Sequence, residues 1–113
     1  MSSIVEASRE TFGELVGSGL VLVDVWGPAC QPCLALAPHV EGIARDHPEL
    51  AVVKLDATKA RRVCIERRVL GLPTFLLFRD GEEVARISNP NLSVEELDAW
   101  LDKQLAQLRT EEE

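Results

Sequence analysis

Two cysteines three residues apart are the part of this sequence best suited to chemistry. Cys30 and Cys33 form a C-x-x-C motif that follows a short apolar run at residues 21–25. At the first turn of a helix, residues with this spacing lie on one side, where two sulfurs can form a bridge. The first turn also has unpaired N–H groups and the positive end of the helix dipole, and both favour a thiolate. A strand that leads into such a motif indicates thiol–disulfide redox chemistry.

A zinc site is the alternative interpretation of the same spacing, because C-x-x-C also provides two of the four ligands in many zinc sites. A closed tetrahedral site needs two further ligands, and the chain offers only Cys64, His39 and His47. None of these forms a second paired motif, so a redox pair is favoured and no metal is expected. Cys64 is interpreted as a small apolar core residue.

Asp24 interrupts the apolar run before the motif, where an ionised carboxylate is costly. We expect burial to raise its pKa, which suits a group that exchanges a proton with Cys33. A structural aspartate satisfied by backbone groups or by Lys54 is the alternative. Lys54 is the candidate charge partner, although an exposed strand lysine would have the same sequence pattern.

The elements that must position these residues follow from periodicity and turn signals. Apolar and β-branched runs predict the strands, at residues 4–5, 20–26, 50–55, 69–78 and 83–88. The fourth strand is entered through Leu72 and Pro73, because proline cannot serve inside a central strand. Asp80 and Gly81 predict a hairpin turn before the last strand.

Helical spacing of apolar residues predicts the helices, at residues 8–16, 30–46, 59–68 and from 93 onward. Ser93 and Glu96 form a capping-box pattern for the last helix. The order βαβαβαββα favours an α/β fold with a mixed central sheet and helices on both faces. With no repeat or linker, residues 1–113 are expected to form a single domain, with residues 110–113 as a frayed acidic tail.

Composition restricts the class of protein. The formal net charge of −7 makes binding to nucleic acid improbable, unless a local basic patch overrides it. The arginines at residues 61–62 and 67–68 form such a cluster, but they alternate with apolar residues and are interpreted as a solvated helix face. The N-terminus shows no secretory signal, and no apolar run approaches the ~20 residues of a membrane helix. We therefore expect a cytoplasmic monomer that does not contact a membrane.

Residues 4–108 resemble the thioredoxin family, through V-L-V-D-V-W-G-P-A-C-Q-P-C and G-L-P-T-F-L-L-F-R-D-G in this order. The resemblance implies the thioredoxin fold and a protein-disulfide reductase. Such an enzyme reduces disulfide-containing proteins, needs no bound cofactor and is regenerated by a flavin-dependent thioredoxin reductase. The version G-P-A-C-x-P-C, with a third cysteine before the proline, is also similar to thioredoxin-like proteins of anaerobic bacteria linked to glycine reductase.

When the roles of the family's residues are carried over to the matching positions, the resemblance implies that Cys30 attacks the substrate and that Cys33 resolves the mixed disulfide. Pro73 corresponds to the cis-proline that faces the two sulfurs. Asp24 takes the place of the buried acid, and Lys54 that of its lysine partner.

The resemblance also implies a groove in which an extended substrate pairs with the backbone beside the proline. The residues expected to border it are Trp26, Ala29, Gln31, Pro32, Leu72, Pro73 and Asn89. Three of them depart from the family pattern: Ala29 replaces Trp, Gln31 replaces Gly, and the loop at Asn89 has about one extra residue. Two alternatives therefore remain, a dedicated electron donor to one partner enzyme and a docking module without essential redox activity.

Overall fold

The chain was analysed as a computed structural model, which describes residues 4–112. The elements follow in the order β1 (Val5–Ala7), α1 (Phe12–Leu15), β2 (Leu20–Trp26), α2 (Gln31–Asp46), β3 (Leu50–Asp56), α3 (Arg61–Glu66), β4 (Thr74–Arg79), β5 (Glu82–Ser88) and α4 (Val94–Glu112). This is the predicted order βαβαβαββα. The predicted bounds of β2 are those of the structure, whereas α1 and α3 are shorter than predicted.

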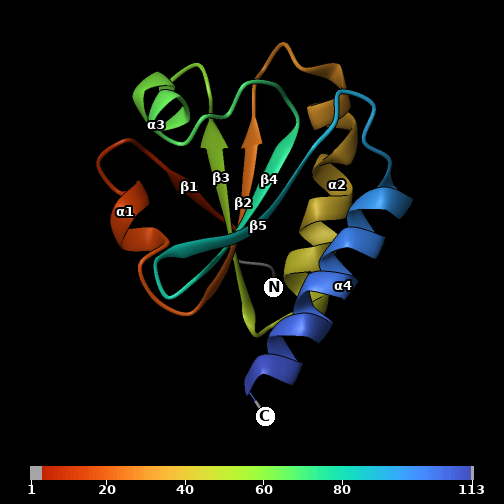
Figure 1. The fold of residues 1–113 in the computed structure, drawn as a ribbon. Coiled ribbons are helices and arrows are strands. Elements are labelled where there is room, and N and C mark those ends of the chain that lie inside the picture. Colours follow the sequence, from red (N-terminus) through yellow and green to blue (C-terminus); the bar gives the residue numbers. More distant parts are fainter. Residues whose placement is uncertain (1–3, 113) are drawn as a thin grey trace.

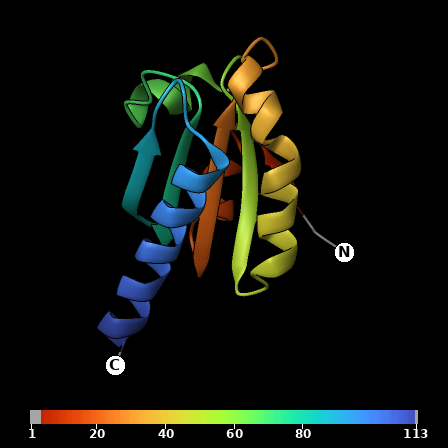
Figure 2. The same ribbon diagram turned by 90° about the vertical axis from the view of Figure 1, so that its right-hand side faces the viewer.

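Five strands form one mixed sheet in the order β1-β3-β2-β4-β5. β2 pairs parallel with β3 and antiparallel with β4, so the strand that leads to the cysteines is the middle of the sheet. α1 and α3 lie on one face of the sheet, and α2 and α4 cover the other (Figures 1 and 2). The predicted α/β architecture, with a mixed sheet and helices on both faces, is confirmed.

Side chains along β2 alternate between two apolar layers. Val23 and Val25 are buried in the layer under α1 and α3, whereas Leu22 belongs to the layer under α2 and α4. Because successive strand residues point to opposite faces, Asp24 lies on the α2/α4 face with Leu22. Lys54 is the registered partner of Asp24 in β3, and so lies on the same face.

β4 begins next to the proline that was expected to start it, and not at the beginning of the apolar run at residues 69–78. The strand starts at Thr74, and the apolar residues before it form a loop in which the Leu72–Pro73 peptide bond is cis. Pro73 has no N–H to contribute to a ladder. Arg68, with a left-handed φ of 56°, turns the chain between α3 and this loop. The apolar run predicted the strand, and the proline predicted its start to within one residue.

Two local signals in the second half of the chain are confirmed. Asp80 and Gly81 have φ values of 49° and 89°, so both residues of the hairpin turn are left-handed, as a type I′ turn requires. At the start of α4, Ser93 Oγ accepts the Glu96 N–H at 3.1 Å, and Glu96 Oε1 accepts the Ser93 N–H at 3.0 Å. This reciprocal pair is a capping box.

α4 continues to Glu112, so the helix extends into the segment that the sequence predicted as a frayed acidic tail at residues 110–113. Thr110 Oγ1 donates to the Ala106 carbonyl at 3.1 Å, and the Glu111 carboxylate lies 3.6 Å from an arginine at the end of β4. Acidic side chains at the carboxyl end of a helix interact unfavourably with the helix dipole. The two contacts offset this effect and stabilise the last turn. The last residue of the chain lies outside the described residues. Neither α4 nor any other helix within residues 4–112 is long and apolar enough to cross a membrane.

Candidate active site

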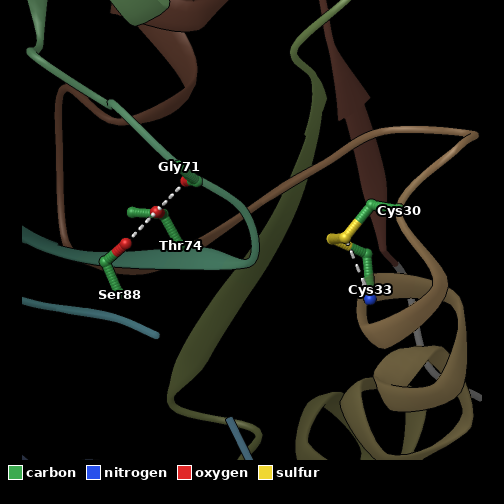
Figure 3. The surroundings of a disulfide bond; sticks show 5 residues. All are labelled: Cys30, Cys33, Gly71, Thr74 and Ser88. Carbon is green, nitrogen blue, oxygen red and sulfur yellow. Dashed lines mark hydrogen bonds between the residues drawn. A yellow bond between two sulfur atoms is a disulfide. The ribbon is translucent and has the colours of Figure 1, made fainter. Parts of the chain in front are cut away.

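The turn between β2 and α2 fixes the position of Cys30. The Cys30 N–H donates to the Gly27 carbonyl at 3.0 Å, and the Cys30 carbonyl accepts the Leu34 N–H at 3.1 Å. Cys30 is therefore the N-cap of α2, and its sulfur accepts the Cys33 N–H at 3.2 Å (Figure 3). An N–H group and the positive end of α2 thus face this sulfur. Both favour the ionised form of Cys30 when it is reduced.

The two sulfurs differ in accessibility. Cys30 and Cys33 are joined by a disulfide, with their Cα atoms 5.3 Å apart, as disulfide geometry allows (Figure 3). Cys33 is only 4% exposed, whereas Cys30 is half-buried and the neighbouring Gln31 is exposed. The prediction that Cys33 is the deeper of the pair is confirmed. A molecule that approaches the motif therefore reaches the Cys30 sulfur first.

Asp24 is a buried carboxyl group in the strand that precedes the motif. It is 3% exposed, and burial raises its pKa from the ordinary 3.8 to about 6, while the nearby charge of Lys54 lowers it. The predicted direction of the shift is confirmed. Burial has the larger effect, because little water remains to solvate the ionised form. A carboxyl group with this pKa can bind or release a proton close to neutral pH.

Lys54 contacts Trp26 as well as influencing Asp24. Its ammonium nitrogen lies 4.9 Å from the centroid of the Trp26 ring, within the range of a cation–π interaction. The Trp26 indole nitrogen is buried and, among the described residues, has no hydrogen-bond partner. The sequence did not predict this stacking. The register of β2 against β3, in which Asp24 is opposite Lys54, could have suggested it.

The loop before β4 lies beside the turn that carries Cys30. A Cβ atom placed on Gly27 would come within 3.2 Å of Leu72 Cδ1, so the Leu72 side chain packs directly against this glycine. Gly27 is the residue whose carbonyl accepts the Cys30 N–H. The structure therefore brings Leu72 next to the cysteine turn, although the two segments are far apart in the sequence. Pro73, which follows, is buried.

Thr74 is a residue of this region that the sequence analysis missed. It is 1% exposed, and its hydroxyl donates to the Gly71 carbonyl at 2.6 Å (Figure 3). The same oxygen lies 2.8 Å from Ser88 Oγ at the end of β5. The bonds tie the loop that contains Leu72 and Pro73 to the edge of the sheet. A polar residue at the start of an otherwise apolar strand was the available signal.

We expect Thr74→Val to destabilise the protein by about 1 kcal/mol, because the Gly71 carbonyl and the Ser88 hydroxyl each lose a part-buried hydrogen bond to the Thr74 hydroxyl. Valine has nearly the same shape, so the change isolates the hydroxyl. Urea unfolding measures the effect. Thr110→Val is the matched control, since the Thr110 hydroxyl is bonded on an exposed turn of α4. Equal losses in the two variants would contradict a special role for Thr74.

The other predicted groove residues divide into two sets. Ala29, Gln31 and Pro32 are exposed beside Cys30, as contact with a substrate requires. Asn89 is half-buried at the end of β5, and its Oδ1 accepts the Asn91 N–H at 2.9 Å. The Asn89 side chain therefore shapes its own loop.

The ligands that a zinc site would need are engaged elsewhere. Cys64 is 8% exposed in the apolar layer under α1 and α3, where burial raises the pKa of its thiol. Its interpretation as a core residue is confirmed. His39 Nε2 lies 2.6 Å from Asp98 Oδ1 and links α2 to α4. Within residues 4–112, no three metal-binding side chains are grouped so that they could hold an ion.

Comparisons with known proteins agree with the fold. A family model described as Thioredoxin matches residues 3–103. The chain is 37% identical over 101 residues to a thioredoxin of Acetoanaerobium sticklandii, a match that covers 87% of this chain and 96% of the relative. It is 35% identical over 103 residues to a thioredoxin of Peptoclostridium acidaminophilum, covering 88% and 94% of the two chains.

Solved structures support the same architecture. The crystal structure of Chlamydomonas reinhardtii thioredoxin f2 superposes with a TM-score of 0.82 at 20% identity, covering 90% of this chain and 96% of that one. A chain from the crystal structure of a ferredoxin:thioredoxin reductase and thioredoxin f2 complex superposes with a TM-score of 0.80, also at 20% identity, covering 91% and 96%. At this identity the likeness shows the fold.

Proposed function

Because this chain belongs to the thioredoxin family, we propose that Cys30 and Cys33 are the dithiol of its thiol–disulfide oxidoreductase activity. The chain reduces disulfides of protein substrates, and a reductase returns it to the dithiol form. One observation carries the assignment to these residues: the Cys30 sulfur is accessible at the start of α2 and accepts the N–H of Cys33. The reaction needs no cofactor beyond the redox-active pair of sulfurs.

In the first step, the Cys30 thiolate attacks one sulfur of the substrate disulfide. A bond forms between Cys30 Sγ and that sulfur, the substrate S–S bond breaks, and the second substrate sulfur leaves as a thiolate. The position of Cys30 supports this role, because the helix terminus favours the ionised nucleophile and the half-buried Cys30 is more accessible to a substrate than the buried Cys33.

In the second step, the Cys33 thiolate attacks Cys30 Sγ in the mixed disulfide. The Cys30–Cys33 bond forms, the bond to the substrate breaks, and the substrate leaves with both sulfurs reduced and two electrons gained. The separation of 5.3 Å between the two Cα atoms supports this step, because the internal bond can close within ordinary disulfide geometry.

Asp24 is proposed to take the proton that Cys33 must lose before it attacks. Its support is the buried position and the pKa of about 6, which make proton uptake near neutral pH possible. Lys54 would be a positioning residue that keeps the pKa of Asp24 from rising further and that stacks on Trp26.

The substrate is proposed to bind in extended form along the backbone of Leu72. Leu72 packs against Gly27 in the cysteine turn, which supports a site shared by the two loops. The exposed residues beside Cys30 would contact the substrate on one side, and Trp26, Pro73 and Asn89 would complete the groove. Because Ala29 and Gln31 replace a large and a small residue of the family pattern, the shape of this groove is expected to be particular to this chain.

We further propose that the regenerating reductase is a flavoprotein and that the protein acts as a single-domain monomer in the cytoplasm. The match to the family over residues 3–103 and the single five-stranded sheet support one domain. The resemblance to proteins linked to glycine reductase stays a prediction.

Insulin reduction coupled to a flavin-dependent thioredoxin reductase and NADPH tests this function. We expect repeated turnover, measured by NADPH oxidation and by the turbidity of the released insulin chains. The reductase could instead reduce this protein efficiently while the protein itself reduces insulin poorly. That result would indicate a dedicated electron donor to one partner enzyme. An absence of insulin reduction even with dithiothreitol as the reductant, in protein that is folded, would contradict the general activity.

A further inference from the structure

A strongly basic segment follows β3 in an otherwise acidic chain. Residues 59–68 contain five basic side chains and one acidic side chain, which gives the segment a formal charge of +4. Since the whole chain has a net charge of −7, the remaining residues have a net charge of −11. The principal extents of the molecule are 40 × 29 × 28 Å, whereas charges in solution are screened over about 10 Å at 0.1 M salt. The charges of distant residues are therefore largely screened at this segment. Lys59 lies beside Glu6, Glu10 and Asp56, so the positive charge that a partner would meet is that of the arginines.

Two large apolar side chains are exposed within and just after this segment. Ile65 is 76% exposed and Leu70 is 96% exposed. Isolated apolar side chains on a surface are ordinary. Here, however, Ile65 lies one turn along α3 from the exposed Arg61 and Arg62, so the three side chains share one face of the helix.

The end of α3 and the following turn are held in place by hydrogen bonds. The Val69 N–H donates to the Cys64 carbonyl at 2.8 Å. From β5, the Arg86 guanidinium donates to the carbonyls of Arg67 and Arg68, at 2.9 and 3.3 Å, and is itself paired with Glu83. The exposed side chains of this turn are therefore attached to a fixed backbone.

The loop after α3 connects this surface to the cysteine turn. Leu70 lies two residues before Leu72, whose side chain packs against Gly27 in the cysteine turn. α3 and the start of α2 lie at the same end of the sheet, on opposite faces, and the loop after α3 passes between them (Figure 1). A protein bound with its disulfide at Cys30 would thus cover this loop and extend toward α3.

We propose that Arg61, Arg62, Ile65, Arg68 and Leu70 form a docking surface for a protein partner whose reacting disulfide is flanked by carboxylates and an apolar side chain. We call these five residues the arginine surface. The proposal rests on the proposed function and defines the chemistry of its partner. Arginine pairs with carboxylates in bidentate geometry, and complementary charge mainly raises the association rate and selects among partners. The apolar contacts at Ile65 and Leu70 add area that is removed from water.

Two disulfide peptides that differ only in their flanking residues, glutamates or lysines, provide the test. The reduced protein reacts with each at about 0.1 M salt, and each rate is divided by the rate with the neutral 2-hydroxyethyl disulfide. We expect the acidic peptide to react about tenfold faster than the basic one, the lower end of electrostatic steering. The total charge of −7 alone would favour the basic peptide, so the two explanations predict opposite signs.

Charge reversal assigns the effect to the arginine surface. The double variant Arg61→Glu, Arg62→Glu should lose or reverse the preference for the acidic peptide. The double variant Lys103→Glu, Arg109→Glu changes the net charge equally on exposed positions of α4, and should keep the preference. The carboxyl end of α4 lies at the opposite end of the molecule from the start of α2 (Figure 1). A wild-type preference for the basic peptide, or equal effects of the two double variants, would overturn the proposal.

Leu70→Ala tests the apolar part of the surface. The rate with an acidic peptide that has a leucine in its flank should fall by about threefold, as expected for partial loss of one apolar contact. The same peptide with serine in place of leucine should react equally with both proteins, and an equal loss with both peptides would contradict the contact. If the wild-type protein reduces neither the neutral disulfide nor insulin, the proposed function itself fails, whereas normal reduction without charge preference removes only the docking surface.

Discussion

Replacing Cys30 by serine is expected to lower the rate of protein-disulfide reduction by about a thousandfold or more, the scale on which loss of a nucleophile affects other enzymes. A serine hydroxyl is not ionised near neutral pH, so the helix terminus that favours a Cys30 thiolate has no nucleophile to stabilise. The Cys33 thiol would remain, but it is 4% exposed and out of reach of a protein substrate. Insulin reduction with dithiothreitol as the reductant measures the loss.

Cys33→Ser should give a different defect from Cys30→Ser. Attack by Cys30 would still occur, but the mixed disulfide would persist, and mass spectrometry should detect the covalent adduct with the substrate. Cys64→Ala is the control, because this thiol is buried on the other face of the sheet and takes no part in the exchange. A Cys30→Ser protein with near-normal activity, or a Cys33→Ser protein that forms no adduct, would contradict the assigned order of attack.

The second large effect is expected for Asp24→Asn, which should stabilise the folded protein at pH 8 by about 3 kcal/mol. The folded state raises the pKa of Asp24 from 3.8 to about 6, so the folded protein binds this proton more tightly than the unfolded chain does. The stabilisation that this provides is complete below pH 3.8 and is lost as the pH rises to 6. Above that pH the folded protein contains a buried carboxylate, whereas asparagine stays neutral.

Urea unfolding of both proteins at pH 4 and pH 8 measures this difference. The gain from Asp24→Asn should be large at pH 8 and small at pH 4, where the wild-type carboxyl group is already mostly protonated in the folded state. Asp102→Asn is the matched control, since Asp102 is exposed on α4 and should show little change at either pH. A gain of the same size at both pH values would contradict burial of a titrating carboxyl group as its cause.

The same variant separates stability from proton transfer. If Asp24 accepts the proton of Cys33, Asp24→Asn should alter the pH dependence of disulfide reduction at the same time as it raises stability. An unchanged pH profile would leave the burial of Asp24 intact but contradict its role as a base. An aspartate on the surface would not destabilise the fold, but its pKa would also not be raised. A buried acid that destabilises the fold at working pH is therefore consistent with a functional requirement for the raised pKa.

Local patterns in the sequence were sufficient for the elements that depend on short-range interactions. The apolar run before the cysteines predicted β2 with its correct ends, since a strand buried on both faces needs such a run. The spacing of Cys30 and Cys33 predicted the start of α2, and Asp80-Gly81 and Ser93 with Glu96 predicted a turn and a cap. For the start of α2, the turn and the cap, the interacting atoms are within a few residues of one another.

The contacts between distant segments were decided by the tertiary structure. Leu72 against Gly27, Lys54 over Trp26 and the hydroxyl pair of Thr74 and Ser88 all depend on strand register and loop position. The same holds for the full length of α4, whose last turn contacts an arginine of β4. Periodicity states which face of an element is apolar, but not which residue of another element lies opposite. Which residues lie opposite one another is decided only when the helices pack on the two faces of the sheet. These contacts determine which side chains a partner meets around Cys30.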